Sequence, residues 1–244
     1  MILFLPLFCC GQTDSLRYSQ VQIRQSQFPN VILRKDLITP ISLMTFGVVS
    51  IRNPYLKNQN TYIRNELQEN IRYKFPIDDY TQYLNTAAFL GLSYLGIPAK
   101  HNLKQRLFTG AVSHAIMAGA VNIMKSSIPI VRPDYSADNS FPSGHTATAF
   151  VGAELMWQEY RDKSIWYGVA GYAVATGTGF FRMYNNKHWL TDVAMGAGVG
   201  ILSTKIAYWM LPLIEGNSNK LPSNFVVLPG YDGQHTTVSM VLTL

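Results

Sequence analysis

The residues best suited to chemistry form three short clusters between residues 125 and 192. In the first cluster, six residues separate Lys125 from Arg132, which is followed by Pro133. A guanidinium group binds two phosphate oxygens in a fork, and an ammonium group adds a point charge. The pair therefore indicates an anion site, and a basic helix end in solvent is the alternative.

The second cluster is Phe141-Pro142-Ser143-Gly144-His145, just before an apolar run. Backbone N–H groups at a helix start are unpaired and bind anions, and glycine allows close approach. The Ser143 hydroxyl adds a donor, and His145 would stand at the rim, suited to protonate a leaving oxygen as general acid. An ordinary N-terminal cap at Ser143 is the alternative.

The third cluster is Arg182, then His188 after five residues, then Asp192 after three. Positions i and i+4 of a helix share a face, so the carboxylate of Asp192 can orient one ring nitrogen of His188. The other nitrogen then carries a free lone pair, as a nucleophilic histidine requires. A surface histidine paired with a nearby acid is the alternative.

The three clusters together supply what phosphoryl transfer requires. Cations hold the charge that develops on the phosphate oxygens, while a nucleophile and an acid act in line. No carboxylate cluster with metal-ligand character accompanies them in the sequence, so we expect a mechanism without metal or cofactor.

The clusters resemble the signature of the type 2 phosphatidic acid phosphatase family, which shares its fold and site with vanadium-dependent haloperoxidases. The family pattern is Lys-x6-Arg-Pro, Pro-Ser-Gly-His and Ser-Arg-x5-His-x3-Asp, and the resemblance spans roughly residues 79–212. It implies that His188 is the nucleophile and forms a phosphohistidine, that Asp192 orients it, and that His145 is the general acid. It also implies inhibition by vanadate and a set of phosphate-binding residues: Lys125, Arg132, Ser143, Gly144 and Arg182.

Two positions depart from the family pattern. Phe181 stands where the family has serine, which removes a small polar group beside Arg182. Asn186 stands where glycine is common, and asparagine tolerates a left-handed turn.

The elements that must position these clusters are expected to be helices. Hydrophobic residues make up 48% of the 244 residues and charged residues only 14%. In a typical soluble domain about a quarter of the residues are charged. Most of the apolar stretches are too long for buried strands, which favours buried helices. They are Leu37–Ile51, Tyr83–Pro98, Leu107–Met124, Thr146–Trp157, Ser164–Phe181 and Val193–Ile214.

Two further segments differ in kind. Thr61–Lys74 is charged and amphipathic, which predicts a surface helix. Residues 225–228 and 236–244 indicate two short strands around a turn. We therefore predict an all-α helical bundle of the type 2 phosphatidic acid phosphatase kind, with the site at one end and a small C-terminal β-hairpin.

Four regions follow from this pattern. Residues 1–11 are similar to the end of a secretory signal peptide, and 12–78 form an N-terminal arm and helices. Residues 79–214 form the phosphatase core and 215–244 the tail. We expect a cell-envelope location, periplasmic or membrane-associated with the site facing the periplasm. Hydropathy alone leaves insertion open, since Leu107–Met124 carries two polar residues.

The predicted reaction is metal-independent hydrolysis of a phosphomonoester or pyrophosphate of an envelope lipid: phosphatidate, an isoprenyl pyrophosphate or lipid A. A net charge of +6 fits an anionic substrate or membrane surface, and no nucleic acid partner is expected. Three alternatives stay open: a periplasmic acid phosphatase acting on small soluble phosphoesters, a vanadium haloperoxidase, and a helical envelope protein that merely retains the fold.

Overall fold

A computed structural model describes residues 35–69, 71, 73–213, 225–231 and 236–242. The predicted signal segment at 1–11 and the arm up to residue 34 lie outside these residues. The described part contains seven α-helices: α1 Lys35–Ser50, α2 Pro54–Gln68, α3 Asp78–Gly91, α4 Leu103–Ser127, α5 Gly144–Tyr160, α6 Ile165–Tyr184 and α7 Leu190–Trp209. Two 3₁₀ turns, Leu92–Leu95 and Leu211–Leu213, follow α3 and α7. The prediction of an all-α fold is confirmed.

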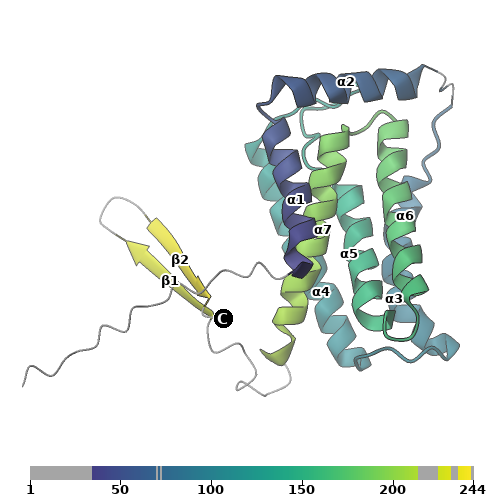
Figure 1. Ribbon diagram of the computed structural model, residues 1–244, viewed down its shortest axis with the longest axis vertical. Helices are drawn as coiled ribbons and strands as arrows, with labels where there is room; N and C mark the ends of the chain where they lie inside the picture. Colours follow the sequence, from purple (N-terminus) through teal and green to yellow (C-terminus); the bar gives the residue numbers. More distant parts are fainter. Residues whose placement is uncertain (1–34, 70, 72, 214–224, 232–235, 243–244) are drawn as a thin grey trace, which may run out of the picture. The chain divides into compact units, whose positions relative to one another are not determined.

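Six of the helices run alongside one another, and α2 lies across one end of them (Figure 1). Helix α5 is central and packs against α3, α4, α6 and α7, while α1 packs along α7. Each predicted apolar stretch corresponds to one helix, with bounds shifted by a few residues.

Polar caps explain the early starts of some helices, because these residues lie outside the predicted stretches. Asn53 accepts a hydrogen bond from the backbone of Leu56, with Pro54 in the first turn of α2. Asn102 forms a capping box with Gln105 at the start of α4. The predicted surface helix at 61–74 is therefore α2, which begins earlier and ends at Gln68.

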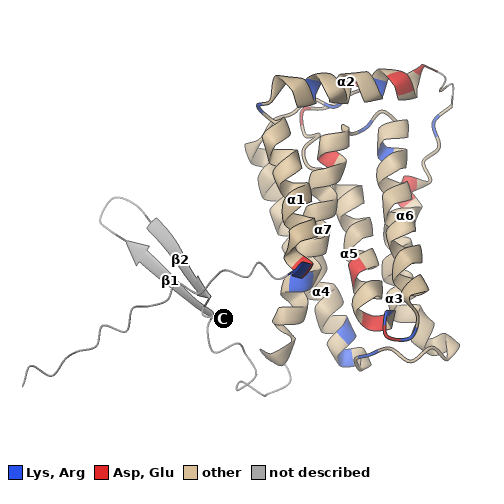
Figure 2. Cartoon of the chain, in the orientation of Figure 1, with Lys and Arg blue, Asp and Glu red and all other residues tan. Residues whose placement is uncertain are grey.

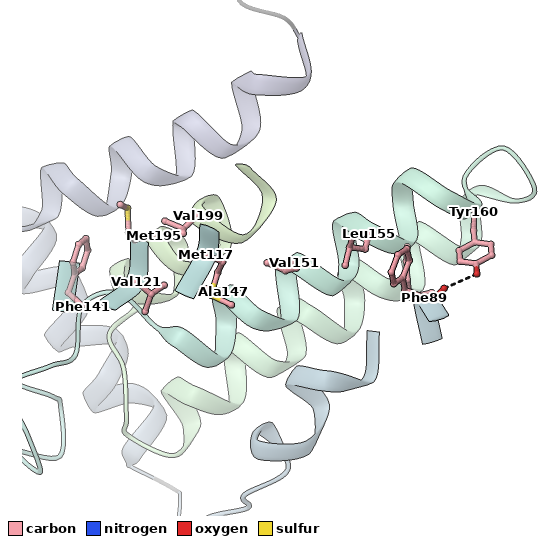
Figure 3. Packing of buried hydrophobic residues seen from close by; sticks show 11 residues of the cluster. Phe89, Met117, Val121, Phe141, Ala147, Val151, Leu155, Tyr160, Met195 and Val199 are labelled. Carbon is pink, nitrogen blue, oxygen red and sulfur yellow. Dashed lines mark hydrogen bonds between the residues drawn. The ribbon is translucent and has the colours of Figure 1, made fainter. Parts of the chain in front are cut away.

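The largest core cluster joins α3, α4, α5 and α7 (Figure 3). It includes Phe89, Val151 and Leu155, which are fully buried. The Tyr160 hydroxyl donates a hydrogen bond of 2.9 Å to the Phe89 carbonyl, so the polar end of this buried ring is satisfied. The core therefore runs along the length of α5.

Helices α5 and α7 approach each other closely at two glycines of α7. A Cβ atom added to Gly196 would lie 2.5 Å from the carbonyl oxygen of Ser143, and one at Gly200 would meet the carbonyl of Ala147. The Ser143 amide also donates a hydrogen bond of 3.0 Å to the carbonyl of Asp192. The starts of the two helices are thus in direct backbone contact.

A buried ion pair lies further along the same helices. Lys205 Nζ of α7 lies 2.8 Å from Glu154 Oε1 of α5, and Gln158 Nε2 donates to the same oxygen at 2.6 Å. The Tyr172 hydroxyl of α6 donates to the other carboxylate oxygen. The charge at Lys205 that interrupts the apolar stretch 193–214 is therefore compensated inside the bundle.

The two C-terminal strands confirm the predicted hairpin. Strand β1, Phe225–Tyr231, pairs antiparallel with β2, Thr236–Leu242, and Phe225 stands opposite Leu242. The segment Pro229-Gly230-Tyr231, expected in the turn, belongs to β1.

Charged residues are sparse along the bundle helices and gather toward their ends (Figure 2). In the part of the chain that the structure describes, Leu103–Ser127 is the one helix long and apolar enough to cross a membrane, with a mean hydropathy of 1.4. Its outward face includes Leu107 and Ile123, which are 51% and 67% exposed.

Candidate active site

The three predicted clusters meet at one end of the bundle. Helices α4 and α6 end there, and α5 and α7 begin there, on the side that α2 crosses (Figure 1). The four helix termini and the two loops between them therefore supply the candidate residues.

His188 lies in the loop before α7, two residues ahead of its first residue, Leu190. The expectation that His188 and Asp192 share a helix is wrong, because Trp189 is the cap and only Asp192 lies in the first turn. The two side chains still face each other, with His188 Nδ1 3.6 Å from Asp192 Oδ2. The geometry thus leaves Nε2 as the ring nitrogen turned away from the carboxylate.

Asp192 is held by two further donors. Its Oδ2 accepts hydrogen bonds from the Ser140 hydroxyl at 2.5 Å and from the Trp189 amide at 2.9 Å. Ser140 Oγ also lies 3.5 Å from His188 Nδ1. Ser140 lies in the loop before α5, whereas His188 and Trp189 lie just before α7, so two separate loops hold the carboxylate in place.

Burial controls the charge of His188, which is only 3% exposed. Burial lowers the pKa of His188 to about 4, Asp192 opposes this shift, and the cations Arg182 and Lys125 add to it. The ring is therefore neutral at ordinary pH, as a nucleophile must be.

Lys125 and Arg132 are held by the same residue, Asn139. Lys125 Nζ donates to the Asn139 carbonyl at 2.5 Å, and Arg132 Nε donates to its side-chain oxygen at 3.0 Å. Among the described residues neither cation forms an ion pair with a carboxylate. Burial, and then Arg182, lower the pKa of Arg132, which shows that the cations repel one another across the site. Their positive charge is thus left for an anion.

The loop that carries Arg132 is tied to the loop that carries His188. Lys187 Nζ lies 2.6 Å from Asp134 Oδ2. Burial raises the pKa of Asp134, but hydrogen bonds from Lys187 and Ser136 outweigh it and bring the value to about 2. The pair therefore stays charged and links the first and third clusters.

Ser143 is the N-cap of α5, the alternative considered above. Its Oγ accepts a long hydrogen bond of 3.5 Å from the Thr146 amide and lies 2.8 Å from Thr146 Oγ1. Gly144 is the first residue of the helix, where a backbone N–H has no acceptor within the helix. The Gly144 amide is therefore a donor that an anion could use, whereas the Ser143 hydroxyl is fully buried at the cap.

Arg182 is buried, and a carboxylate of α3 neutralises its charge. Its Nη1 lies 2.5 Å from Asp78 Oδ2, and the other oxygen of Asp78 accepts from Asn185 Nδ2 at 2.6 Å. The Nε of Arg182 is buried and has no hydrogen-bond partner among the residues that the structure describes. An unpaired buried donor is costly, so this N–H is available for an oxygen of a ligand.

His145 pairs with the next residue of α3, since its Nε2 lies 2.9 Å from Asp79 Oδ1. Asp78, Asp79 and His145 offer three ligand atoms within 4.8 Å of one another, a group of the kind that can hold a metal. Asp78 is, however, taken by Arg182, and Asp79 by His145. The sequence predicted no carboxylate cluster with metal-ligand character; Asp78 and Asp79 do form such a group with His145, but both carboxylates are engaged in ion pairs within the protein.

Helix α2 fixes the loops from outside. Arg64 donates to Asn186 Oδ1 at 3.0 Å and to the Pro133 carbonyl at 3.3 Å, and Gln68 donates to the Tyr184 carbonyl at 3.0 Å. Asn186 has a φ of 61°, the left-handed turn expected at this position.

A cavity of about 980 Å³ lies beside these loops, and its lining includes Arg52, Lys57, Val131, Trp189 and Asp192.

Comparison with known proteins agrees with this architecture. The sequence model of the PAP2 superfamily matches residues 113–214, which contain all three clusters. In this region the chain is similar in sequence to the PAP2 superfamily.

Two curated proteins are similar in sequence to part of this chain. A lipid A 1-phosphatase of Porphyromonas gingivalis is 45% identical over 139 residues, which is 57% of this chain and 31% of the relative. The bacitracin transport permease protein BcrC of Bacillus licheniformis is 33% identical over 82 residues, which is 34% of this chain and 38% of the relative. The chain therefore spans about a third of the length of the curated relatives it matches.

A solved structure shares the PAP2 fold. The transmembrane PAP2 type phosphatidylglycerolphosphate phosphatase of Bacillus subtilis aligns with a TM-score of 0.53 and 19% identity. The alignment covers 75% of this chain and 98% of that protein. It extends beyond the PAP2 match at residues 113–214 and supports the fold of the helical bundle as a whole.

Three residues at the PAP2 site escaped prediction: Asp78, Asp79 and Ser140. The aspartates lie 104 and 66 residues from their partners Arg182 and His145, so no local spacing relates them. The signal available in the sequence was a pair of adjacent acidic residues at the start of an apolar helix. Phe181, where the family has serine, packs its ring against those of Phe180 and Tyr184 instead of contacting the site.

Proposed function

We propose that this protein is a phosphatase that removes a phosphate group from a membrane lipid through a phosphohistidine. The observation that carries the proposal is the set of cations around His188. Within the described part of the chain, Lys125 and Arg132 are bound by oxygens of Asn139 without a carboxylate partner, and Arg182 Nε is an unpaired buried donor. A tetrahedral anion would satisfy all three at once.

The proposed reaction has two steps. In the first, His188 Nε2 attacks phosphorus in line, the bond to the leaving oxygen breaks, and His145 gives that oxygen a proton. In the second, His145 takes a proton from water, the hydroxide attacks the phosphohistidine, and the P–N bond breaks to release phosphate. Asp192 holds the ring and stabilises its positive charge throughout.

No step of this mechanism uses a metal ion. The three cations and the Gly144 amide supply the charge stabilisation that metals give in two-metal phosphatases. Vanadate, which resembles the five-coordinate state of phosphorus, is the proposed inhibitor.

The proposed substrate is a lipid phosphate of the cell envelope, with the 1-phosphate of lipid A first. The 45% identity to the P. gingivalis lipid A 1-phosphatase supports this choice, and the phosphatidylglycerolphosphate phosphatase shares only the fold. The exposed apolar face of α4 supports association with a membrane. We propose that the site faces the periplasm. A phosphatidate or an isoprenyl pyrophosphate would fit the same anion site.

The test is phosphate release in EDTA from lipid A, phosphatidic acid, an isoprenyl pyrophosphate and p-nitrophenyl phosphate. Wild type should release phosphate from at least one lipid, with lipid A preferred, and His188→Ala should release none. Substrate labelled with ³²P on the transferred phosphate, quenched in alkali, should leave acid-labile label on wild type. Equal release by His188→Ala would overturn the assignment of the nucleophile, and a preference for p-nitrophenyl phosphate would favour the soluble phosphatase.

A further inference from the structure

Two adjacent aspartates open α3, and they face different partners. Asp78 is 1% exposed and is bound by Arg182 and Asn185, as described above. Asp79 has a side chain that is 56% exposed, and its Oδ1 lies 2.9 Å from His145 Nε2 and 3.8 Å from Arg182 Nη1. The first turn of α3 thus contacts both a phosphate-binding cation and the proposed general acid.

The Asp79–His145 contact decides which ring nitrogen of His145 can transfer a proton. If Nε2–H is donated to the carboxylate, a neutral ring has a bare Nδ1 and no proton to give. A protonated ring carries hydrogen on both nitrogens, so its Nδ1–H is free to be transferred. Among the described residues Nδ1 of His145 has no hydrogen-bond partner.

We propose that Asp79 is a positioning residue that holds His145 by Nε2 and keeps the ring protonated, so that Nδ1–H is the proton given to the leaving group. This inference rests on the proposed phosphatase function. As the P–O bond breaks, its electron pair goes to the leaving oxygen, which takes the Nδ1 proton. The N–H electron pair stays on Nδ1, and the ring becomes neutral with Nε2–H still bound to Asp79.

The charges around His145 explain why such a partner is needed. The pKa of His145 lies below its ordinary value: burial lowers it most and Arg182 of α6 lowers it further, while Asp79 and Asp78 of α3 offset only part of this shift. Lys125 of α4 and Arg132 add positive charge to the same site. Without the carboxylate, the ring would lose its proton at lower pH and could not act as an acid.

The dependence on the leaving group gives a sharp test. Alkoxide and sugar oxygens need a proton to leave, whereas p-nitrophenolate leaves without one. Asp79→Asn should therefore lower kcat for a lipid phosphomonoester by about tenfold to a hundredfold, the range of a lost acid–base contribution. It should change kcat for p-nitrophenyl phosphate by less than about threefold, and the alkaline limb for the lipid should move to lower pH.

A double-mutant cycle and a control complete the design. In a His145→Ala background, Asp79→Asn should have no further effect, because its partner is gone. Asp79→Glu should restore part of the lipid activity. Asp162→Asn, which removes an exposed carboxylate after the far end of α5, should leave both substrates unchanged.

Equal slowing of both substrates by Asp79→Asn, or a further loss in the His145→Ala background, would overturn the proposal. A measurement independent of activity is the NMR titration of His145 in protein labelled with ¹³C-histidine. The His145 signal, assigned with His145→Ala, should titrate at lower pH in Asp79→Asn than in wild type, and an unchanged midpoint would also overturn it. Failure of the phosphatase proposal is distinct, since wild type would then release no phosphate from any substrate.

Discussion

The two histidines of the site stand in different surroundings although each faces an aspartate. His188 is buried and its partner Asp192 lies 3.6 Å away, bound also by Ser140 and Trp189. His145 lies 2.9 Å from Asp79, whose side chain is 56% exposed. The roles proposed for His188 as nucleophile and His145 as acid draw on this difference, because burial favours the neutral ring and a close carboxylate opposes that shift.

The lowered pKa of His188 predicts a specific dependence of stability on pH. The folded chain keeps His188 neutral down to about pH 4, whereas the unfolded chain takes up a proton near 6.5. The unfolded state therefore binds more protons between these values, so this contribution is complete above pH 6.5 and is lost as pH falls toward 4. The full loss is about 3 kcal/mol.

Unfolding in denaturant at pH 7 and pH 4.5 checks this expectation. Wild type should lose more stability between the two pH values than His188→Asn, which has no titrating ring. Equal losses would mean that His188 titrates normally in the folded chain.

Spacing along the sequence could find His188, Arg182 and Lys125 because each belongs to a short pattern. Asp78 and Asp79 could not be found this way, because a contact between α3 and the starts of α5 and α7 exists only in the folded chain. The same limit applies to Asn139, which the sequence suggests only as part of a loop and which binds two cations.

At the scale of elements, the glycines of α7 set how closely the helices pack. Gly196→Ala should destabilise the fold by about 1–3 kcal/mol, because the added Cβ would lie 2.5 Å from the Ser143 carbonyl and must push α5 and α7 apart. Thermal unfolding measures this effect. Phosphatase activity should fall as well, since the starts of both helices carry site residues.

Gly119→Ala is the matched control. It lies on an exposed part of α4, and nothing lies within 4 Å of an added Cβ. This change should be neutral or stabilise the chain by about 0.4–1 kcal/mol, because alanine favours a helix. Equal destabilisation by both variants would show that helix packing at Gly196 is looser than the structure indicates.

The apolar stretches predicted the helices well because each is too long and too uniform for a strand. Their bounds were less predictable, since caps such as Asn53 and Asn102 are polar residues outside the apolar pattern. The orientation of α2 across the bundle end depends on long-range hydrogen bonds from Arg64 and Gln68, which no local pattern contains.

At the scale of the whole molecule, the apolar outer face of α4 predicts lipid association. The chain should sediment with membranes and stay there after an alkaline carbonate wash. Leu107→Lys with Ile123→Lys should weaken this association, because both positions are exposed and charges in lipid are unfavourable. Gln59→Lys, on the exposed side of α2, is the control and should behave as wild type. A wild type that is soluble without detergent would contradict the expectation.

The backbone contact between α5 and α7 also has a consequence for protein engineering. Because Gly196 lies against Ser143 without an intervening side chain, the starts of α5 and α7 hold the proposed anion donor Gly144 and the loop of the proposed nucleophile His188 at a fixed separation. A chimera with a relative of different substrate preference should therefore exchange α5 and α7 together. Grafts confined to the surface of α2 would instead alter one wall of the cavity beside the site loops. The distance between the starts of α5 and α7 would stay the same.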